Sequence, residues 1–223
     1  MTINETFKEL KSNLSKILET GLSIDNKIPI INKTRTKITW ENQMDLSNAL
    51  KNMPYEEKYR TLEKDRNFNF KMLDGALIQM MYEFDKNGRK LISHRLAYFP
   101  STTLERYDDA YEEYENPYFV NSEFYDVREK NIITFPIRFD YNNNETKFRE
   151  IEHPYSHATL GEYEYCRIPV SSPLTPSIFI NFILRNFYNY AFREKGIFCN
   201  VSNKRFGNTI VGKENGILHF NII

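Results

Sequence analysis

The stretch GALIQMMYEFDKNGRKLISHRLAYF, residues 75–99, decides the fold class of this chain. Two runs rich in apolar and aromatic residues flank an Asn-Gly pair at 87–88. That pair favours a type I′ turn, because both central positions of such a turn require a positive φ. The pattern therefore predicts an antiparallel hairpin with strands over 75–84 and 90–99.

Further strand signals follow towards the C-terminus. The β-rich runs cover residues 132–141, 146–152, 156–160 and 163–169, and residues 209–222 suggest a closing hairpin around Glu214, Asn215 and Gly216. Turns rich in Asn and Gly separate these runs. Pro136 cannot donate to a strand ladder, which favours an edge strand or a bulge at its position. We expect a central antiparallel meander of about six strands.

Helices are expected near both ends of the chain. Residues 4–20 and 55–66 have helical periodicity, a short helix is predicted over 45–53, and residues 26–42 look extended. The strongest helix signal covers 176–193, where Thr175 is the expected N-cap and Pro176 takes the first helical position. This helix is apolar around most of its circumference, so it should be buried.

These elements predict an α+β fold with N-terminal helices and a single domain over residues 1–223. An N-terminal helical segment at 1–66 precedes a core at 67–223. In that core the long helix 176–193 packs on the sheet.

Composition limits the classes of function. The net charge is zero, so binding of nucleic acid would need a local basic patch, and residues 105–127 are acidic. The chain has two cysteines and lacks a signal peptide or an apolar run of membrane-spanning length, which favours a cytoplasmic protein without membrane contact. With eight glycines and no phosphate-binding glycine loop, HExxH, CxxC or GxSxG motif, we expect no cofactor.

The candidate catalytic residues lie between residues 153 and 167. His157 on one predicted strand and Arg167 on the next could face each other across the intervening turn, with His153 and Tyr163 in support. Tyr163 and Tyr165 could stack bases or support the site. Histidine titrates near neutrality and arginine presents a fixed fork to phosphate oxygens, so this set suits cleavage of RNA without a metal. The alternative is structural: a histidine bound to a backbone carbonyl and an arginine paired with a glutamate.

Other chemistry fits the same region less well. His153, His157 and Cys166 could supply metal ligands, but their spacing matches no established ligand pattern, so no metal is expected. Cys166 alternates with its neighbours in a predicted strand and is better explained as a small core residue than as a nucleophile. Asp140 and the Glu145-Thr146-Lys147 run resemble part of a metal nuclease signature, but a tight turn separates them.

A basic patch is a further expectation. Arg95 points away from the face that His94 shares with Leu96 and Tyr98. If both groups of strands belong to one sheet, Arg95, Arg138 and Arg167 converge despite the zero net charge. Arg95 and Arg138 are therefore candidate nucleic-acid-binding residues.

The chain also resembles a bacterial family known only as a domain of unknown function. The resemblance rests on His-Pro-x-Ser-His, Gly, Cys-Arg-Ile-Pro and Pro-Leu-Thr-Pro within residues 153–176, and on Asp-Gly-Ala-Leu-Ile-Gln at 74–79. It covers about residues 55–193. It implies a small cytoplasmic bacterial protein encoded near phage-defence or mobile-element genes, and it assigns no catalytic residues.

Two functions remain open from the sequence. The first is a defence or toxin-type effector that acts on nucleic acid by acid–base chemistry. The second is a non-catalytic subunit that holds or regulates a larger effector or ATPase encoded nearby, through aromatic residues and the acidic 105–127 segment.

Overall fold

The structure is a computed structural model that describes residues 1–19, 21–34, 36–44, 53–102, 135–163, 165–194, 196 and 203–222. The acidic segment 105–127, Cys199 and most of the helix expected at 45–53 lie outside these residues. The elements in chain order are α1 (Ile3–Glu19), β1 (Ser23–Asn26), β2 (Pro29–Ile31), β3 (Lys37–Trp40), α2 (Tyr55–Lys64), β4 (Phe70–Met72), β5 (Leu77–Phe84), β6 (Leu91–Phe99), β7 (Ile137–Asn142), β8 (Ser156–Leu160), β9 (Ile168–Pro169), α5 (Pro176–Phe187), α6 (Asn189–Glu194) and the 3₁₀ helix η2 (Gly212–Gly216).

The strands form one nine-stranded sheet in the order β1-β4-β5-β6-β7-β8-β9, with β3 also paired to β5 and β2 to β3. All strand pairs are antiparallel. The α+β class is confirmed, but the expected six strands are too few. The difference comes from β1 to β4, four strands that were not expected, and from residues 146–152, which were expected as a strand and form none. The sequence had indicated only that residues 26–42 are extended.

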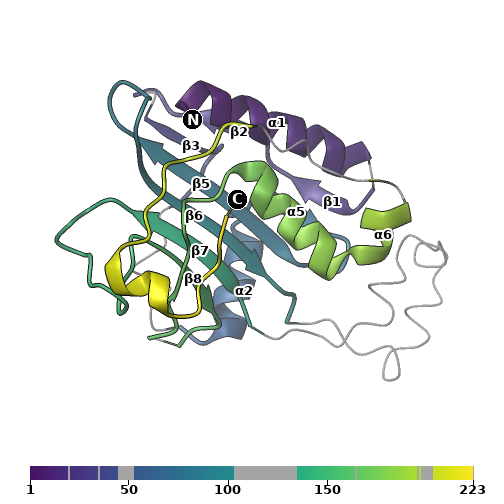
Figure 1. The fold of residues 1–223 in the computed structure, drawn as a ribbon. Coiled ribbons are helices and arrows are strands. Elements are labelled where there is room, and N and C mark those ends of the chain that lie inside the picture. The colour runs from purple at the N-terminus through teal and green to yellow at the C-terminus, as the bar shows by residue number, and fades with distance from the viewer. Residues whose placement is uncertain are drawn as a thin grey trace.

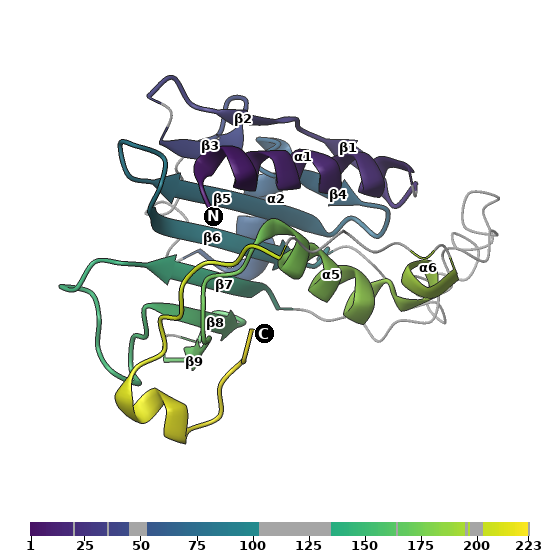
Figure 2. The same cartoon turned by 45° about the horizontal axis from the view of Figure 1, so that its top comes forward.

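Helices cover the two faces of the sheet unequally. Helices α1 and α5 lie side by side on one face, and α2 lies on the other (Figures 1 and 2). Alternation along β5 explains this arrangement, because Ile78 and Tyr82 join the core under α1 and α5 while Leu77 packs with Tyr59 and Leu62 of α2. The part of the second face beyond α2 carries polar side chains.

The prediction of one continuous helix over 176–193 is wrong, because the helix is broken at Tyr188 into α5 and α6. Its predicted start is confirmed: Thr175 accepts a hydrogen bond from the Ile178 amide, and Pro176 is the first helical residue. Tyr188 has φ −133° and ψ 46°, which are not helical values. Its buried hydroxyl donates a hydrogen bond to the Asp74 carboxylate at 2.7 Å. A buried hydroxyl needs such a partner, and Tyr188 reaches it at the point where the helix is broken.

Two predicted strands and the predicted C-terminal hairpin differ in the structure. Residues 146–152 form turns, and the strand expected at 163–169 is reduced to β9. The closing hairpin at 209–222 is absent from the described part of the chain, where residues 212–216 form η2. Phe220 instead makes a parallel bridge with Val170, so the C-terminal segment pairs with the end of β9 rather than with itself.

The edge-strand interpretation of Pro136 is also wrong. Strand β7 pairs with β6 on one side and with β8 on the other. Pro136 lies directly before the first residue of β7, where its missing amide breaks no ladder bond.

The described helices include none that is both long enough and apolar enough to cross a membrane.

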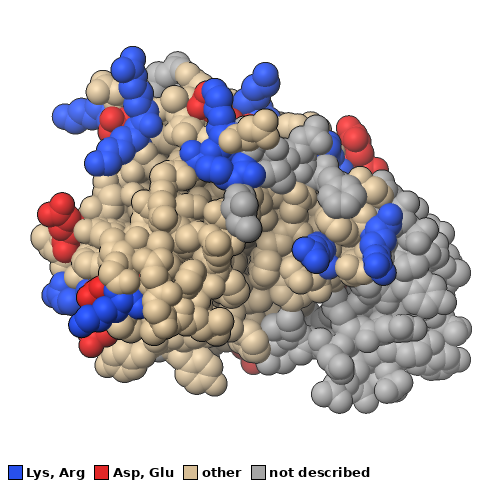
Figure 3. All heavy atoms as spheres, in the orientation of Figure 1, with Lys and Arg blue, Asp and Glu red and all other residues tan. Residues whose placement is uncertain are grey.

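Charge is dispersed over the face that carries α1 and α5. Figure 3 shows Lys and Arg there in separate groups around a largely uncharged middle. The described Lys and Arg side chains on this face therefore form no single basic patch.

Candidate functional site

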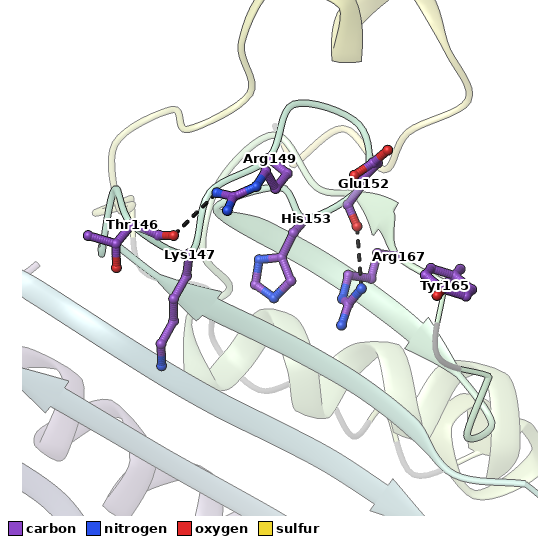
Figure 4. A pocket seen from close by; sticks show the side chains of 7 residues that line it. All are labelled: Thr146, Lys147, Arg149, Glu152, His153, Tyr165 and Arg167. Carbon is purple, nitrogen blue, oxygen red and sulfur yellow. Dashed lines mark hydrogen bonds between the residues drawn. The ribbon is translucent and has the colours of Figure 1, made fainter.

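An open hollow lies where the β7–β8 connection meets the loop before β9. Its cavity volume is about 380 Å³, and its lining residues are Thr146, Lys147, Arg149, Glu152, His153, Tyr165 and Arg167. Three of these side chains are cationic and one is acidic. Figure 4 shows His153 between Lys147 and Arg167, with Tyr165 beyond Arg167. The hollow therefore combines positive charge, an imidazole and an aromatic ring.

The connection between β7 and β8 presents these residues by means of tight turns. The Asn144 carboxamide oxygen accepts from the Thr146 amide at 2.9 Å and from its hydroxyl at 2.8 Å. Arg149 and His153 pair as an isolated bridge, with amide–carbonyl distances of 3.1 and 2.7 Å. Because that bridge closes the loop, Arg149 and His153 are held opposite each other.

Ile151 at the tip of this loop has a strained backbone. Its φ is +70°, which is unusual for a β-branched side chain. The Glu152 amide donates to the Glu150 carbonyl at 2.9 Å, so residues 150–152 form a γ-turn with a positive central φ. Strain of this kind persists only where the surrounding contacts enforce it, and it often accompanies binding sites.

The C-terminal segment supplies one of those contacts. The Lys213 amide in η2 donates to the Glu150 carboxylate at 2.7 Å. Gly212 has a φ of +34°, which favours glycine, and a Cβ there would displace the Glu150 carboxylate from this contact. The lining loop is thus fixed between η2 and β8.

Two arginines of the hollow are oriented by main-chain oxygens. The Arg149 guanidinium donates to the carbonyls of Thr146 at 3.3 Å and Phe148 at 2.8 Å, and Arg167 donates to the carbonyl of Glu152 at 3.4 Å (Figure 4). Carbonyl groups orient a guanidinium without cancelling its charge. The hollow therefore retains a positive character that suits a phosphate.

The two histidines of the region have different positions. His153 lines the hollow and is half-buried, whereas His157 is 6% exposed. The ring centroids are 5.1 Å apart. The Nδ1 atom of His157 lies 3.0 Å from the Pro154 carbonyl, so Nδ1 carries the proton of that contact. His157 thus matches the structural alternative, a histidine bound to a backbone carbonyl, and supports His153 from behind.

Burial lowers the pKa of both imidazoles, and the charge of Arg167 lowers that of His153 further. Each ring is therefore neutral near neutral pH. A neutral imidazole that is open to solvent and surrounded by cations can accept a proton from a bound ligand. Of the two histidines, His153 lines the hollow and His157 does not.

A second charged group lies on the adjoining face of the sheet. Arg95 donates to the Asp140 carboxylate at 3.2 Å, and the Arg138 guanidinium lies 4.0 Å from it. Burial opposes ionisation of Asp140, but the two arginines outweigh it and hold its pKa below the usual value. Asp140 is the register partner of His157, so this group adjoins the histidines.

The predicted residues thus fall into three places. His153 and Arg167 line the hollow, and the buried ring of His157 packs against that of His153. Arg95 and Arg138 instead meet at Asp140. Tyr163 is 79% exposed and does not line the hollow; Tyr165 does.

Lys147 and Arg149 were not predicted as residues of this site, although Lys147 was considered as part of a metal nuclease signature. Residues 146–152 form turns instead of the expected strand, so strand alternation does not place these two cations in the hollow. The signal that points to them is the run of asparagines at 142–144, which marks a turn directly before both residues.

Within the described ranges, no group of three or more His, Cys, Asp or Glu side chains is placed to hold a metal ion. Cys166 is half-buried, and its sulfur accepts from the Leu160 amide at 3.5 Å.

Comparison with known proteins gives one match. No curated protein and no solved structure matches the chain significantly. A family described as "Uncharacterized conserved protein (DUF2290)" matches residues 22–222, a wider span than the sequence signature suggested. The chain therefore belongs to this family.

Proposed function

We propose that the protein binds RNA in the hollow and cleaves it by acid–base chemistry. The observation that carries this proposal is the placement of a solvent-facing, neutral His153 among Lys147, Arg149 and Arg167. Cations bind the phosphate and stabilise the charge that develops on it, and the imidazole takes the proton of the attacking hydroxyl.

In the proposed reaction His153 accepts the proton of a ribose 2′-hydroxyl. The 2′-oxygen attacks phosphorus, and the bond from phosphorus to the 5′-oxygen breaks. Water gives the leaving 5′-oxygen a proton, and the hydroxide that remains takes the proton back from the His153 imidazolium. The products are a 2′,3′-cyclic phosphate and a free 5′-hydroxyl. Arg167 and Arg149 hold the phosphate oxygens, and His157 positions His153 from below.

Expression of the chain in bacteria tests this proposal. The wild type should degrade cellular RNA and slow growth, as expected of a defence or toxin-type effector, and His153→Ala should abolish both effects. The matched control is His219→Ala, because His219 lies in the C-terminal segment outside the hollow. Equal RNA damage by wild type and His153→Ala would refute the assignment.

The alternative function is that of a non-catalytic interaction subunit. The observation that favours it is a run of exposed apolar side chains near the C-terminus, in which Leu218 is 85% exposed and Ile217 and Phe220 are each 40% exposed. On this alternative, Leu218→Asp should abolish a complex with the co-expressed product of a neighbouring gene, and His153→Ala should preserve it. Loss of the complex with His153→Ala alone would contradict it.

A further inference from the structure

We propose that the ligand is a single strand of RNA, with one unpaired base stacked on Tyr165. This inference rests on the proposed function, because it uses the same hollow. It adds the class of substrate, single-stranded rather than duplex RNA, and the residue that selects it.

Tyr165 is the first observation. Its side chain is 83% exposed, although it lines the hollow beside Arg167 (Figure 4). A ring of this size in contact with water is available to the face of a base, and such stacking tolerates any base because every base has a π face. The position of Tyr165 thus provides a stacking platform next to a cation that binds phosphate.

The main chain around Tyr165 is held in place. The Cys166 amide donates to the Tyr163 carbonyl at 3.2 Å, and the Arg167 amide donates to the Tyr165 carbonyl at 3.0 Å. The Cys166 sulfur accepts from the Leu160 amide, which ties this turn to the end of β8. A fixed backbone reduces the entropy that the loop loses when a base stacks on the ring.

The arrangement of charge gives the path of the strand. Lys147 and Arg149 lie on one side of His153, and Arg167 and Tyr165 lie on the other (Figure 4). A backbone that crosses the hollow places one phosphate beside His153 and the base of a neighbouring nucleotide over Tyr165. The volume of about 380 Å³ is at the small end of ligand pockets, and it suits one nucleotide unit at a time.

Base stacking on Tyr165 excludes a duplex. In A-form RNA each base is paired and both of its faces are covered by neighbouring bases. A base can reach the ring only after it leaves that stack, which costs a few kcal/mol. The hollow should therefore discriminate against paired RNA even though both forms carry the same phosphates.

Binding of a labelled 2′-O-methyl oligouridylate, followed by fluorescence anisotropy, tests this inference. The probe keeps the bases and phosphates but lacks the attacking hydroxyl, so binding is measured without cleavage. We expect Tyr165→Leu to weaken binding about tenfold and Tyr165→Phe to retain it, since the ring provides the stacking energy. The matched control Tyr163→Leu, which removes an equally exposed ring two residues away, should leave the affinity unchanged.

Annealing the probe to its complement completes the test, and the duplex should bind more weakly than the single strand. Equal affinity for duplex and single strand, or an unchanged affinity in Tyr165→Leu, would overturn the inference; the second result would instead fit a Tyr165 that contacts a protein. Tyr165-dependent binding without cleavage of an unmodified strand would leave this inference standing and refute the proposed reaction. Cleavage that is independent of Tyr165 would do the reverse.

Discussion

His94 lies in the middle of β6 with its ring shielded from water. The ring is 5.6 Å from that of Tyr82 and 6.0 Å from that of Tyr141, measured between centroids. Its Nε2 atom accepts from the Leu174 amide at 3.1 Å, so the neutral ring links the sheet to the residues that precede α5. The face that the sequence assigned jointly to His94, Leu96 and Tyr98 is therefore a buried face.

Burial lowers the pKa of His94 from 6.5 to about 4. The unfolded chain therefore takes up a proton at a pH where the folded protein does not, and stability falls as the pH drops from 6.5 towards 4. The difference corresponds to about 3 kcal/mol. We expect the free energy of unfolding, measured with urea, to fall less between pH 6.5 and 4 in His94→Gln than in the wild type. The Gln amide oxygen can accept the same hydrogen bond and does not titrate. An identical pH dependence in wild type and variant would contradict this account of His94.

At the scale of elements, the break between α5 and α6 depends on a buried polar contact. Tyr188 is 1% exposed, and its hydroxyl donates to the carboxylate of Asp74 in the turn before β5. The Asp74 carboxylate also accepts from the Ala76 amide at 3.1 Å. This contact connects the end of the buried helix to the sheet.

Replacing Tyr188 with phenylalanine tests that contact. The change removes a hydrogen bond to a buried carboxylate, so we expect the free energy of unfolding to fall by about 1–3 kcal/mol. Chemical denaturation measures it. Tyr163→Phe, at an exposed ring, is the control and should change stability by less than about 0.5 kcal/mol. A loss in Tyr188→Phe no larger than in the control would show that the hydroxyl does not stabilise the fold.

Arg95, Arg138 and Asp140 form a charged group that joins two elements, β6 and β7. Its net positive charge adjoins the hollow, and we expect Arg138 to contact a phosphate of the bound strand. Arg138→Gln should reduce the slope of log K against log salt by about 0.7, the value for one phosphate contact of a single strand. The control Arg185→Gln lies on α5, on the opposite face, and should leave the slope unchanged. An unaltered slope in Arg138→Gln would exclude this residue from the binding surface.

At the scale of the whole molecule, elements marked by local sequence signals were predicted correctly, whereas elements that depend on pairing between distant residues were not. The β5–β6 hairpin, β8, α1 and the start of α5 were predictable because turn residues, alternation and caps lie within each segment. Strands β1 and β3 were missed as strands, because they are short and pair with β4 and β5, which lie far away in sequence. The C-terminal segment was misassigned for the same reason, since Phe220 pairs with Val170.

The site was predictable in part. His153 and Arg167 come together because β8 and β9 are neighbours. The sequence offered both Tyr163 and Tyr165 as supporting rings, and the turn that this segment forms brings Tyr165 to the hollow. Lys147 and Arg149 reach the hollow through the turn around Asn144, which the asparagine run predicts, and through the γ-turn at Ile151. The γ-turn was not predictable, because the adjoining Glu150 is held by Lys213, which is far away in sequence.

The central claim is that His153 activates a ribose hydroxyl in a cationic hollow. The most direct measurement is end-group analysis of an RNA strand cut by the purified protein, with a single 2′-O-methyl substitution placed along the strand. We predict 2′,3′-cyclic phosphate ends, no cut at the substituted nucleotide, and no cut anywhere with His153→Ala. Products with a 3′-hydroxyl and a 5′-phosphate, or cleavage at the 2′-O-methyl position, would contradict the claim.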